Sequence, residues 1–136
     1  MKQSIKPNIW GPHGWKFMHY VSLGYPDNPS QQDKNNYKRF YYSLKDVLPC
    51  DKCATNYETN ITEYPIDNHL DSRESLIKWV VDIHNKVNVE TGKNELSYED
   101  ATELYRKGDA AQMIEYCFRI IVLIIVLVFI YYLSLK

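Results

Sequence analysis

Cys50 and Cys53 are the residues of this chain best suited to carry out chemistry. They stand two residues apart in the stretch Pro49-Cys50-Asp51-Lys52-Cys53. Two thiols at this spacing can close a small disulfide ring, which exchanges electron pairs with other thiols. The same spacing is also half of a zinc site, so the surrounding residues must decide between the two.

Two groups of aromatic, imidazole and amide side chains flank this pair in the sequence. Trp15 and His19 are one helical turn apart, and Trp79, His84 and Asn88 follow one another along a later helical pattern. Such side chains suit a planar aromatic cofactor. Each group alone is more commonly part of a core, but two of them around one Cys-x-x-Cys favour a dithiol that works with a bound redox cofactor.

Length, charge and cysteine count limit the possible functions. The 136 residues allow one domain and an appendage, and the net charge of −1 gives no sign of a nucleic-acid partner. Three cysteines are too few for a disulfide-stapled secreted scaffold, and Met1–Trp10 has no apolar core of signal-peptide length. We therefore expect the domain to begin in a reducing compartment, where a Cys-x-x-Cys is typically catalytic or metal-binding.

Apolar residues at helical spacing predict an all-α fold, and no alternating strand pattern of any length is present. The pattern predicts a four-helix bundle with short connections and a short fifth helix. The first expected helix runs from Gly11 to the breaker cluster 24–29, and the second from the capping residue Ser30 to about Pro49. The third runs from the dithiol through Ile61. The fourth runs from the cap at Asp71 to Thr91, and the fifth from the cap at Ser97 through Tyr105.

The C-terminal part differs in kind from the rest. Residues 120–135 are apolar apart from Ser134, and 116–118 extend the run upstream past Arg119. A helix needs about 20 residues to cross a bilayer, so we expect a transmembrane helix over about 116–135 with Arg119 reaching to the interface. A buried core helix is the alternative, but a domain this small offers little room for one.

These segments suggest three regions: a flexible N-terminus at 1–10, a soluble domain at 11–107, and a membrane-proximal segment with the transmembrane helix at 108–136. Gly108 is expected to separate the last two. Arg106, Lys107 and Arg119 precede the apolar segment, and only Lys136 follows it. Because positive charges favour the cytosolic side, we expect a single-pass membrane protein with a cytosolic soluble domain.

The Cys-x-x-Cys has three alternative interpretations besides a dithiol that works with a bound cofactor. A zinc-stabilised adaptor would need two further ligands among His13, His19, His69 and His84, none of which have paired spacing. A thioredoxin-like site would need strands around the pair. A membrane-tethered helical interaction module with an incidental Cys-x-x-Cys also stays open.

In its motifs the sequence closely resembles the Erv/ALR family of FAD-linked sulfhydryl oxidases, over about residues 10 to 105. The matching motifs are Trp15-x-x-x-His19, Tyr25-Pro26, Cys50-x-x-Cys53, the run 79–88 ending in His84-Asn85-x-Val87-Asn88, and Gly92-Lys93. The form with a membrane segment and without a second Cys-x-x-Cys is most similar to the short members found in large cytoplasmic DNA viruses.

This resemblance implies a homodimeric four-helix bundle with a short fifth helix that holds FAD non-covalently at its mouth. Cys53 would lie against the flavin, and Cys50 would be the outer thiol that substrate dithiols attack. Electrons would pass through the flavin to O2 and make H2O2, and no metal would be needed. The implied cofactor-binding residues are Gly11, Trp15, His19, Tyr25, Cys53, Trp79, His84, Asn85, Val87, Asn88 and Lys93.

The chain departs from the family pattern in two respects. Many members carry a structural disulfide between helix four and the following loop, where this chain has Val81 and about Tyr98. It also lacks a shuttle dithiol outside the bundle and offers only Cys117, which is more readily explained as a buried or acylated membrane-edge cysteine. The electron donor is therefore expected to be a separate small dithiol protein, such as a thioredoxin-like relay. If the protein is viral, the membrane would be a host internal membrane or that of the virion.

Overall fold

A computed structural model describes residues 4–134 of the chain, except the side chains of 107–113 and 134. All regular elements in this range are helical, so the predicted all-α class is confirmed. The helices are α1 (Pro7–Leu23), α2 (Gln31–Val47), α3 (Asp51–Glu63), the 3-10 helix η1 (Ile66–His69), α4 (Arg73–Glu90) and α5 (Tyr98–Ser134).

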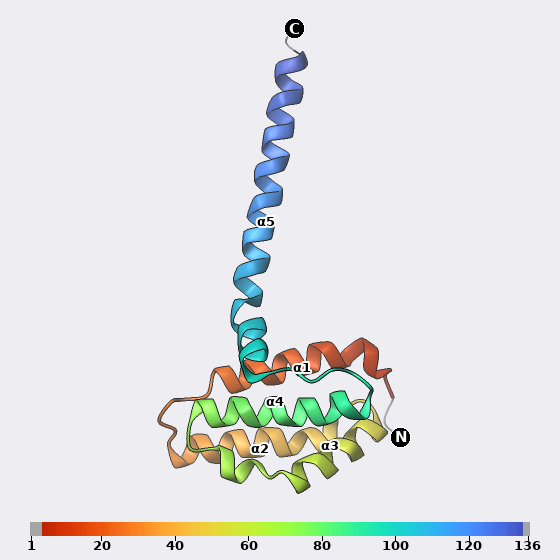
Figure 1. Ribbon diagram of the computed structural model, residues 1–136, viewed down its shortest axis with the longest axis vertical. Helices are drawn as coiled ribbons and strands as arrows, with labels where there is room; N and C mark the ends of the chain where they lie inside the picture. The colour runs from red at the N-terminus through yellow and green to blue at the C-terminus, as the bar shows by residue number, and fades with distance from the viewer. Residues whose placement is uncertain (1–3, 135–136) are drawn as a thin grey trace. The chain divides into compact units, whose positions relative to one another are not determined.

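Helices α1 to α4 form the predicted four-helix bundle. In it α1 packs on α4, α2 packs on α3, and α3 packs on α4, as Figure 1 shows. The centre is aromatic and aliphatic: Trp79 meets the ring of Tyr41 edge-on, with ring centroids 5.2 Å apart, and Ile66, Leu76 and Ile83 are buried around them. Burying such side chains is the main favourable term that holds the helices together.

The ends of the helices follow local sequence signals, with some differences from the predictions. The capping box of Ser30 and Asp33 is confirmed, as is the cap of Ser97, whose hydroxyl accepts the N–H of Asp100 at 3.0 Å. The predicted cap at Asp71 is wrong by one residue, because Ser72 caps α4 and accepts the N–H of Ser75 at 3.2 Å.

Helix α1 begins four residues earlier than predicted. Residues 7–10, which were expected in a flexible segment, are helical, and Pro7 occupies the first turn. A proline is well placed there because the first amides of a helix have no partner within the helix. Pro12 lies inside α1.

Helix α5 does not end before Gly108, so the predicted break there is wrong. The helix is continuous over 37 residues, and the compact units of the chain divide within it, between Thr102 and Glu103. Within the described residues, the stretch Ile114–Leu133 is long and apolar enough to cross a membrane. At about 1.5 Å per residue its 20 residues reach about 30 Å, which matches a bilayer core.

The predicted transmembrane range 116–135 ends just outside the described residues. Its one basic residue, Arg119, is paired with Glu115 one helical turn earlier, at 2.6 Å. An acidic residue four positions before a basic one is the favourable order on a helix. The pair therefore leaves no net charge at this end of the apolar segment.

Candidate active site

The structure joins Cys50 and Cys53 in a disulfide at the start of α3, with their Cα atoms 5.2 Å apart. Cys50 has an extended backbone and is the N-cap of α3, and its sulfur accepts the N–H of Cys53 at 3.2 Å. Unpaired amides and the helix dipole favour negative charge at this position. The site is therefore arranged to stabilise a thiolate when the disulfide opens.

The exposure of the two cysteines does not follow the expected order of outer and inner thiol. Cys50 is 8% exposed, whereas Cys53 is partly exposed. The chain just before α1 lies beside this site, because the N–H of Ile5 donates to the carbonyl of Pro49 at 2.8 Å. The roles of the two sulfurs thus stay a prediction, and Cys50 is the more buried of the two residues.

Three predicted ring residues from α1 and α4 come together in one cluster. Trp15 and His84 are stacked, with centroids 4.1 Å apart and planes 9° apart. Nε2 of His19 lies 3.0 Å from Nδ1 of His84, so one imidazole donates a hydrogen bond to the other. His19 is buried and the other two rings are partly buried. His84 of the second group identified in the sequence therefore joins Trp15 and His19 of the first group in one cluster.

Burial keeps both imidazoles of this cluster neutral at pH 7. Desolvation, reinforced by His84, lowers the pKa of His19 to about 3. Desolvation and then the positive charge of Lys93 lower the pKa of His84 to about 4. Lys93 therefore lies near enough to act on the cluster electrostatically, as expected for a residue of the same site. Neutral rings can stack and form hydrogen bonds without bringing buried charge.

Asn85 has a structural role that its place in the motif did not reveal. Its amide donates to the carbonyl of Leu96 at 2.8 Å, and its oxygen accepts the N–H of Leu96 at 2.9 Å. Asn88 donates to the same oxygen at 3.3 Å, and its carbonyl accepts the N–H of Lys93 at 2.8 Å. These two asparagines fasten the loop that carries Lys93 to the end of α4.

Tyr25 and Trp79, also expected at the cofactor, lie in the bundle core. They are 0% and 1% exposed, and their polar groups are engaged by the backbone. The hydroxyl of Tyr25 donates to Leu70 O at 2.8 Å, and the indole of Trp79 donates to Tyr64 O at 2.9 Å. Their contact with a cofactor stays a prediction, and their contribution to the core is evident.

Gly11 and Val87 are partly buried. Gly11 lies one turn before Trp15 on α1, and a Cβ built at Gly11 would meet no atom of the chain within 4 Å. Packing within the described chain therefore does not require a glycine there. A glycine at such a position allows a ligand to approach the helix closely.

A separate cleft of about 570 Å³ lies between α3, α4 and the loop after α4. Among the predicted site residues, only Asn85 lines it. Four carboxylates also line it, against the single cation Lys86: those of Glu63, Asp82, Glu90 and Glu95. A pyrophosphate would be repelled by this lining, so the cleft does not suit a dinucleotide.

The structure gives no support to the zinc or thioredoxin-like alternatives. Among the side chains that the structure describes, no three from His, Cys, Asp or Glu are grouped to hold a metal ion. Residues 4–134 contain no strand, which a thioredoxin-like site requires. The dithiol lies instead at a helix N-terminus within a helical bundle.

Polar contacts join α4 to the start of α5 near Val81 and Tyr98, the positions at which the family resemblance would place a structural disulfide. The hydroxyl of Tyr98 donates to the carboxylate of Asp82 at 2.6 Å, next to Val81 on α4. This hydrogen bond is the first cause of the rise in the pKa of Tyr98 to about 12. Together with the hydrogen bonds from Asn85 to Leu96, it joins α4 non-covalently to the start of α5.

Comparison with known proteins identifies a family for this chain. The model of the Erv1 / Alr family matches residues 12–107. The chain is 49% identical over 104 residues to the probable FAD-linked sulfhydryl oxidase R368 of Acanthamoeba polyphaga mimivirus, covering 76% of this chain and 73% of that protein. It is 32% identical over 111 residues to the putative FAD-linked sulfhydryl oxidase 096R of Invertebrate iridescent virus 3. This match covers 79% of this chain and 75% of that protein.

A solved structure agrees in fold as well. The crystal structure of the yeast Erv1 core matches with a TM-score of 0.71 at 29% identity, over 76% of this chain and 86% of that one. The family model spans most of the bundle and includes the dithiol and the ring cluster. The chain therefore belongs to the Erv1 / Alr family.

Proposed function

We propose that this protein is a FAD-linked sulfhydryl oxidase that forms disulfides in partner dithiol proteins. The observation that carries this proposal is the Cys50–Cys53 disulfide at the start of α3, in a family bundle that gathers Trp15, His19 and His84 into one cluster. The viral relatives named above carry the same activity in their names.

The disulfide accepts an electron pair by thiol exchange. A partner thiolate attacks the sulfur of Cys50, the Cys50–Cys53 bond breaks, and Cys53 leaves as a thiolate. The partner's second thiolate then attacks its own sulfur in the mixed disulfide and releases Cys50. The partner is oxidised and the pair is reduced, with no change in the number of sulfur–sulfur bonds. The amide of Cys53 and the N-terminus of α3 stabilise negative charge during this exchange.

The residues gathered at α1 and α4 fit FAD. The stacked, uncharged rings of Trp15 and His84 suit a planar aromatic group, and the open space at Gly11 allows one to lie close to α1. Lys93, fastened by its backbone to Asn88, supplies a positive charge suited to a pyrophosphate. Bound there, FAD would supply the redox chemistry that accepts the electron pair of the reduced cysteines and delivers it to O2, with H2O2 as the product.

We further propose that α5 anchors the enzyme in a membrane through Ile114–Leu133, with the soluble domain in the cytosol. The positive residues before the segment support this orientation. We propose a host internal membrane or the virion membrane as the location, because the relatives named above are viral proteins. The electron donor is a small thioredoxin-like dithiol protein, because the described chain offers the single free cysteine Cys117 and no shuttle pair. A homodimer is part of this proposal on the family resemblance.

The test uses the full chain purified in mild detergent. A yellow protein with a flavin absorption band that consumes O2 in the presence of dithiothreitol and releases H2O2 supports the proposal. A colourless protein that gains no flavin on incubation with FAD, and consumes no O2, contradicts it. Adding bulky folded thiol proteins as alternative donors tests the expected partner, because they should be oxidised more slowly than small dithiols.

A further inference from the structure

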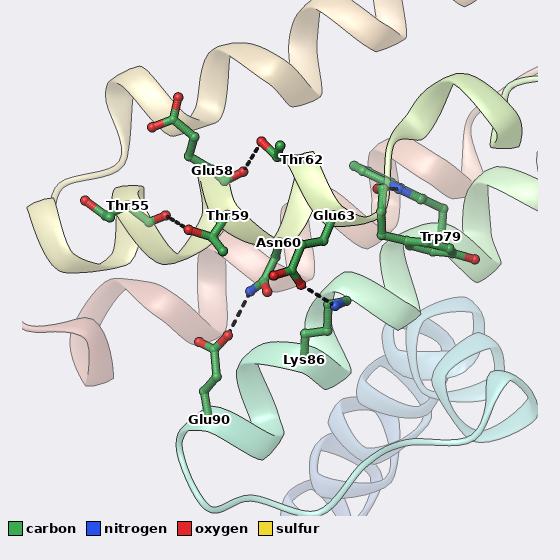
Figure 2. Close-up of polar contacts among 10 residues, drawn as sticks. Thr55, Glu58, Thr59, Asn60, Thr62, Glu63, Trp79, Lys86 and Glu90 are labelled. Atoms are coloured by element: carbon green, nitrogen blue, oxygen red, sulfur yellow. Dashed lines mark hydrogen bonds and ion pairs between the residues drawn. The ribbon is translucent and has the colours of Figure 1, made fainter.

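A carboxylate at the end of α4 holds the helix that carries the redox pair. One oxygen of Glu90 accepts the side-chain amide of Asn60 at 3.0 Å, and the other accepts that of Asn56 at 3.1 Å. Figure 2 shows Glu90 reaching from α4 to Asn60 on α3. The two asparagines are four residues apart, so Glu90 contacts two successive turns of α3.

The burial of Asn60 makes this contact specific. Asn60 is only 4% exposed, and a buried amide without an acceptor is costly. A carboxylate is a strong acceptor for amide hydrogens, and its two oxygens can serve both asparagines at once. The contact therefore resists sliding of α3 along α4 in either direction.

The position of the contact relative to the dithiol gives it a functional consequence. Asn56 lies three residues after Cys53, which is within one helical turn. The other side-chain ion pair or hydrogen bond between α3 and α4 in the described chain, Lys86 with Glu63 at 3.2 Å, lies at the far end of α3. Glu90 thus holds the turn next to the redox pair.

We propose that Glu90 is a positioning residue for the dithiol, an inference that rests on the proposed oxidase function. Glu90 stands two residues after Asn88 and belongs to the helix that carries His84. By holding α3 against this helix, it fixes how closely the sulfur of Cys53 approaches a flavin held by α1 and α4. Reaction between a thiolate and a flavin requires contact, and a displacement of about 1 Å can cost about 100-fold in rate.

The test compares Glu90→Ala, Glu90→Gln and the matched control Glu63→Ala in the full chain loaded with FAD. The rate of flavin bleaching by a small dithiol without oxygen is measured, with FAD affinity and the thiolate–flavin charge-transfer absorption. We expect Glu90→Ala to slow bleaching by about 10-fold or more and to weaken the charge-transfer absorption. Its FAD affinity should stay close to that of the wild type. Glu90→Gln should recover part of the rate, and Glu63→Ala should match the wild type.

Bleaching by Glu90→Ala within twofold of the wild-type rate would overturn the inference, as would equal slowing in Glu63→Ala. If Glu90→Ala does not fold, Asn56→Ala replaces it, since this change removes only the donor nearest Cys53. Slowed bleaching in Asn56→Ala supports the inference, and an unchanged rate overturns it. A wild-type protein that binds no flavin would refute the proposed function itself, a result distinct from an active wild type that tolerates Glu90→Ala.

Discussion

His84 lies flat against Trp15, with ring centroids 4.1 Å apart and planes 9° apart, so that α4 and α1 meet through two parallel rings. The same imidazole is 3.0 Å from that of His19. His84 is the central member of the cluster, because its ring centroid lies 4.1 Å from that of Trp15 and 5.3 Å from that of His19, whereas those two centroids are 6.5 Å apart. Its removal should disturb the cluster more than the loss of any other member.

We expect His84→Ala to weaken FAD binding by about 10- to 100-fold. The loss of one ring contact and one hydrogen bond costs about 1–3 kcal/mol in total. FAD affinity is measured by fluorescence titration of the full chain. His69→Ala is the control, because His69 lies on η1 and contacts Tyr64 and Ser75 instead. Unchanged affinity in His84→Ala would remove this cluster from the cofactor site.

Acid should destabilise the bundle through the two buried histidines. Their pKa values in the folded state are lowered to about 3 for His19 and about 4 for His84, from an ordinary value of 6.5. Below about pH 6.5 the unfolded chain binds protons that the folded chain does not, so stability is present above this pH and is lost as the pH falls toward 4. Each histidine contributes a slope of at most about 1.4 kcal/mol per pH unit.

Thermal melting of the FAD-free protein between pH 7 and pH 4.5 checks this dependence. The melting temperature should fall steadily with pH, and His84→Asn should reduce the slope because one of the two titrating groups is gone. His13→Ala, which changes an exposed side chain, should keep the wild-type slope. A melting temperature that is independent of pH over this range would show that the imidazoles are not buried in neutral form.

Asn85→Ala should loosen the loop between α4 and α5 and lower the free energy of unfolding by about 1–3 kcal/mol, because two hydrogen bonds to Leu96 are lost. Hydrogen exchange at residues 91–97 should rise. Tyr98→Phe removes only the hydrogen bond to Asp82 and should cost about 1 kcal/mol. Hydrogen exchange that is unchanged in Asn85→Ala would mean that the loop is held by other contacts.

Local sequence signals predicted the helices well because each depends on neighbouring residues. The capping box of Ser30 and Asp33 and the buried face of Met18, His19 and Ser22 follow from short spacings, and the structure has both. The break expected at Gly108 failed because one glycine costs a helix only about 1 kcal/mol, which flanking helix-forming residues can offset.

Contacts between distant residues were harder to predict from the sequence. His19 and His84 are 65 residues apart, and no spacing rule states that their rings meet. The motif that contains Asn85 likewise gave no sign that its amide holds Leu96, and its role at the cofactor stays a prediction. The hydrogen bond between Asn60 and Glu90 could not be recognised from any sequence pattern. Such pairs become visible only when the packing of the helices is known.

Cys53→Ser should abolish turnover yet leave FAD bound. The variant cannot form the disulfide with Cys50 that accepts the electron pair, while the rings of α1 and α4 are unchanged. Oxygen consumption and the flavin absorption of the purified protein separate these two properties. Cys117→Ser is the control and should keep wild-type turnover, since Cys117 is an exposed free cysteine outside the bundle. Loss of FAD from Cys53→Ser alone would contradict the role assigned to this sulfur.

Gly11→Ala should separate the stability of the bundle from its cofactor binding. Glycine inside a helix costs about 0.5–1 kcal/mol relative to alanine, and the new methyl group would meet no atom of the chain within 4 Å. The FAD-free variant should therefore melt at a higher temperature than the wild type. If FAD lies close to α1 at this position, the same methyl group should raise the dissociation constant for FAD. Gly14→Ala is the matched control, because its methyl group would lie 3.1 Å from the ring of Trp10 and should give no comparable gain in stability. An unchanged dissociation constant for FAD in Gly11→Ala would place the cofactor away from this turn of α1.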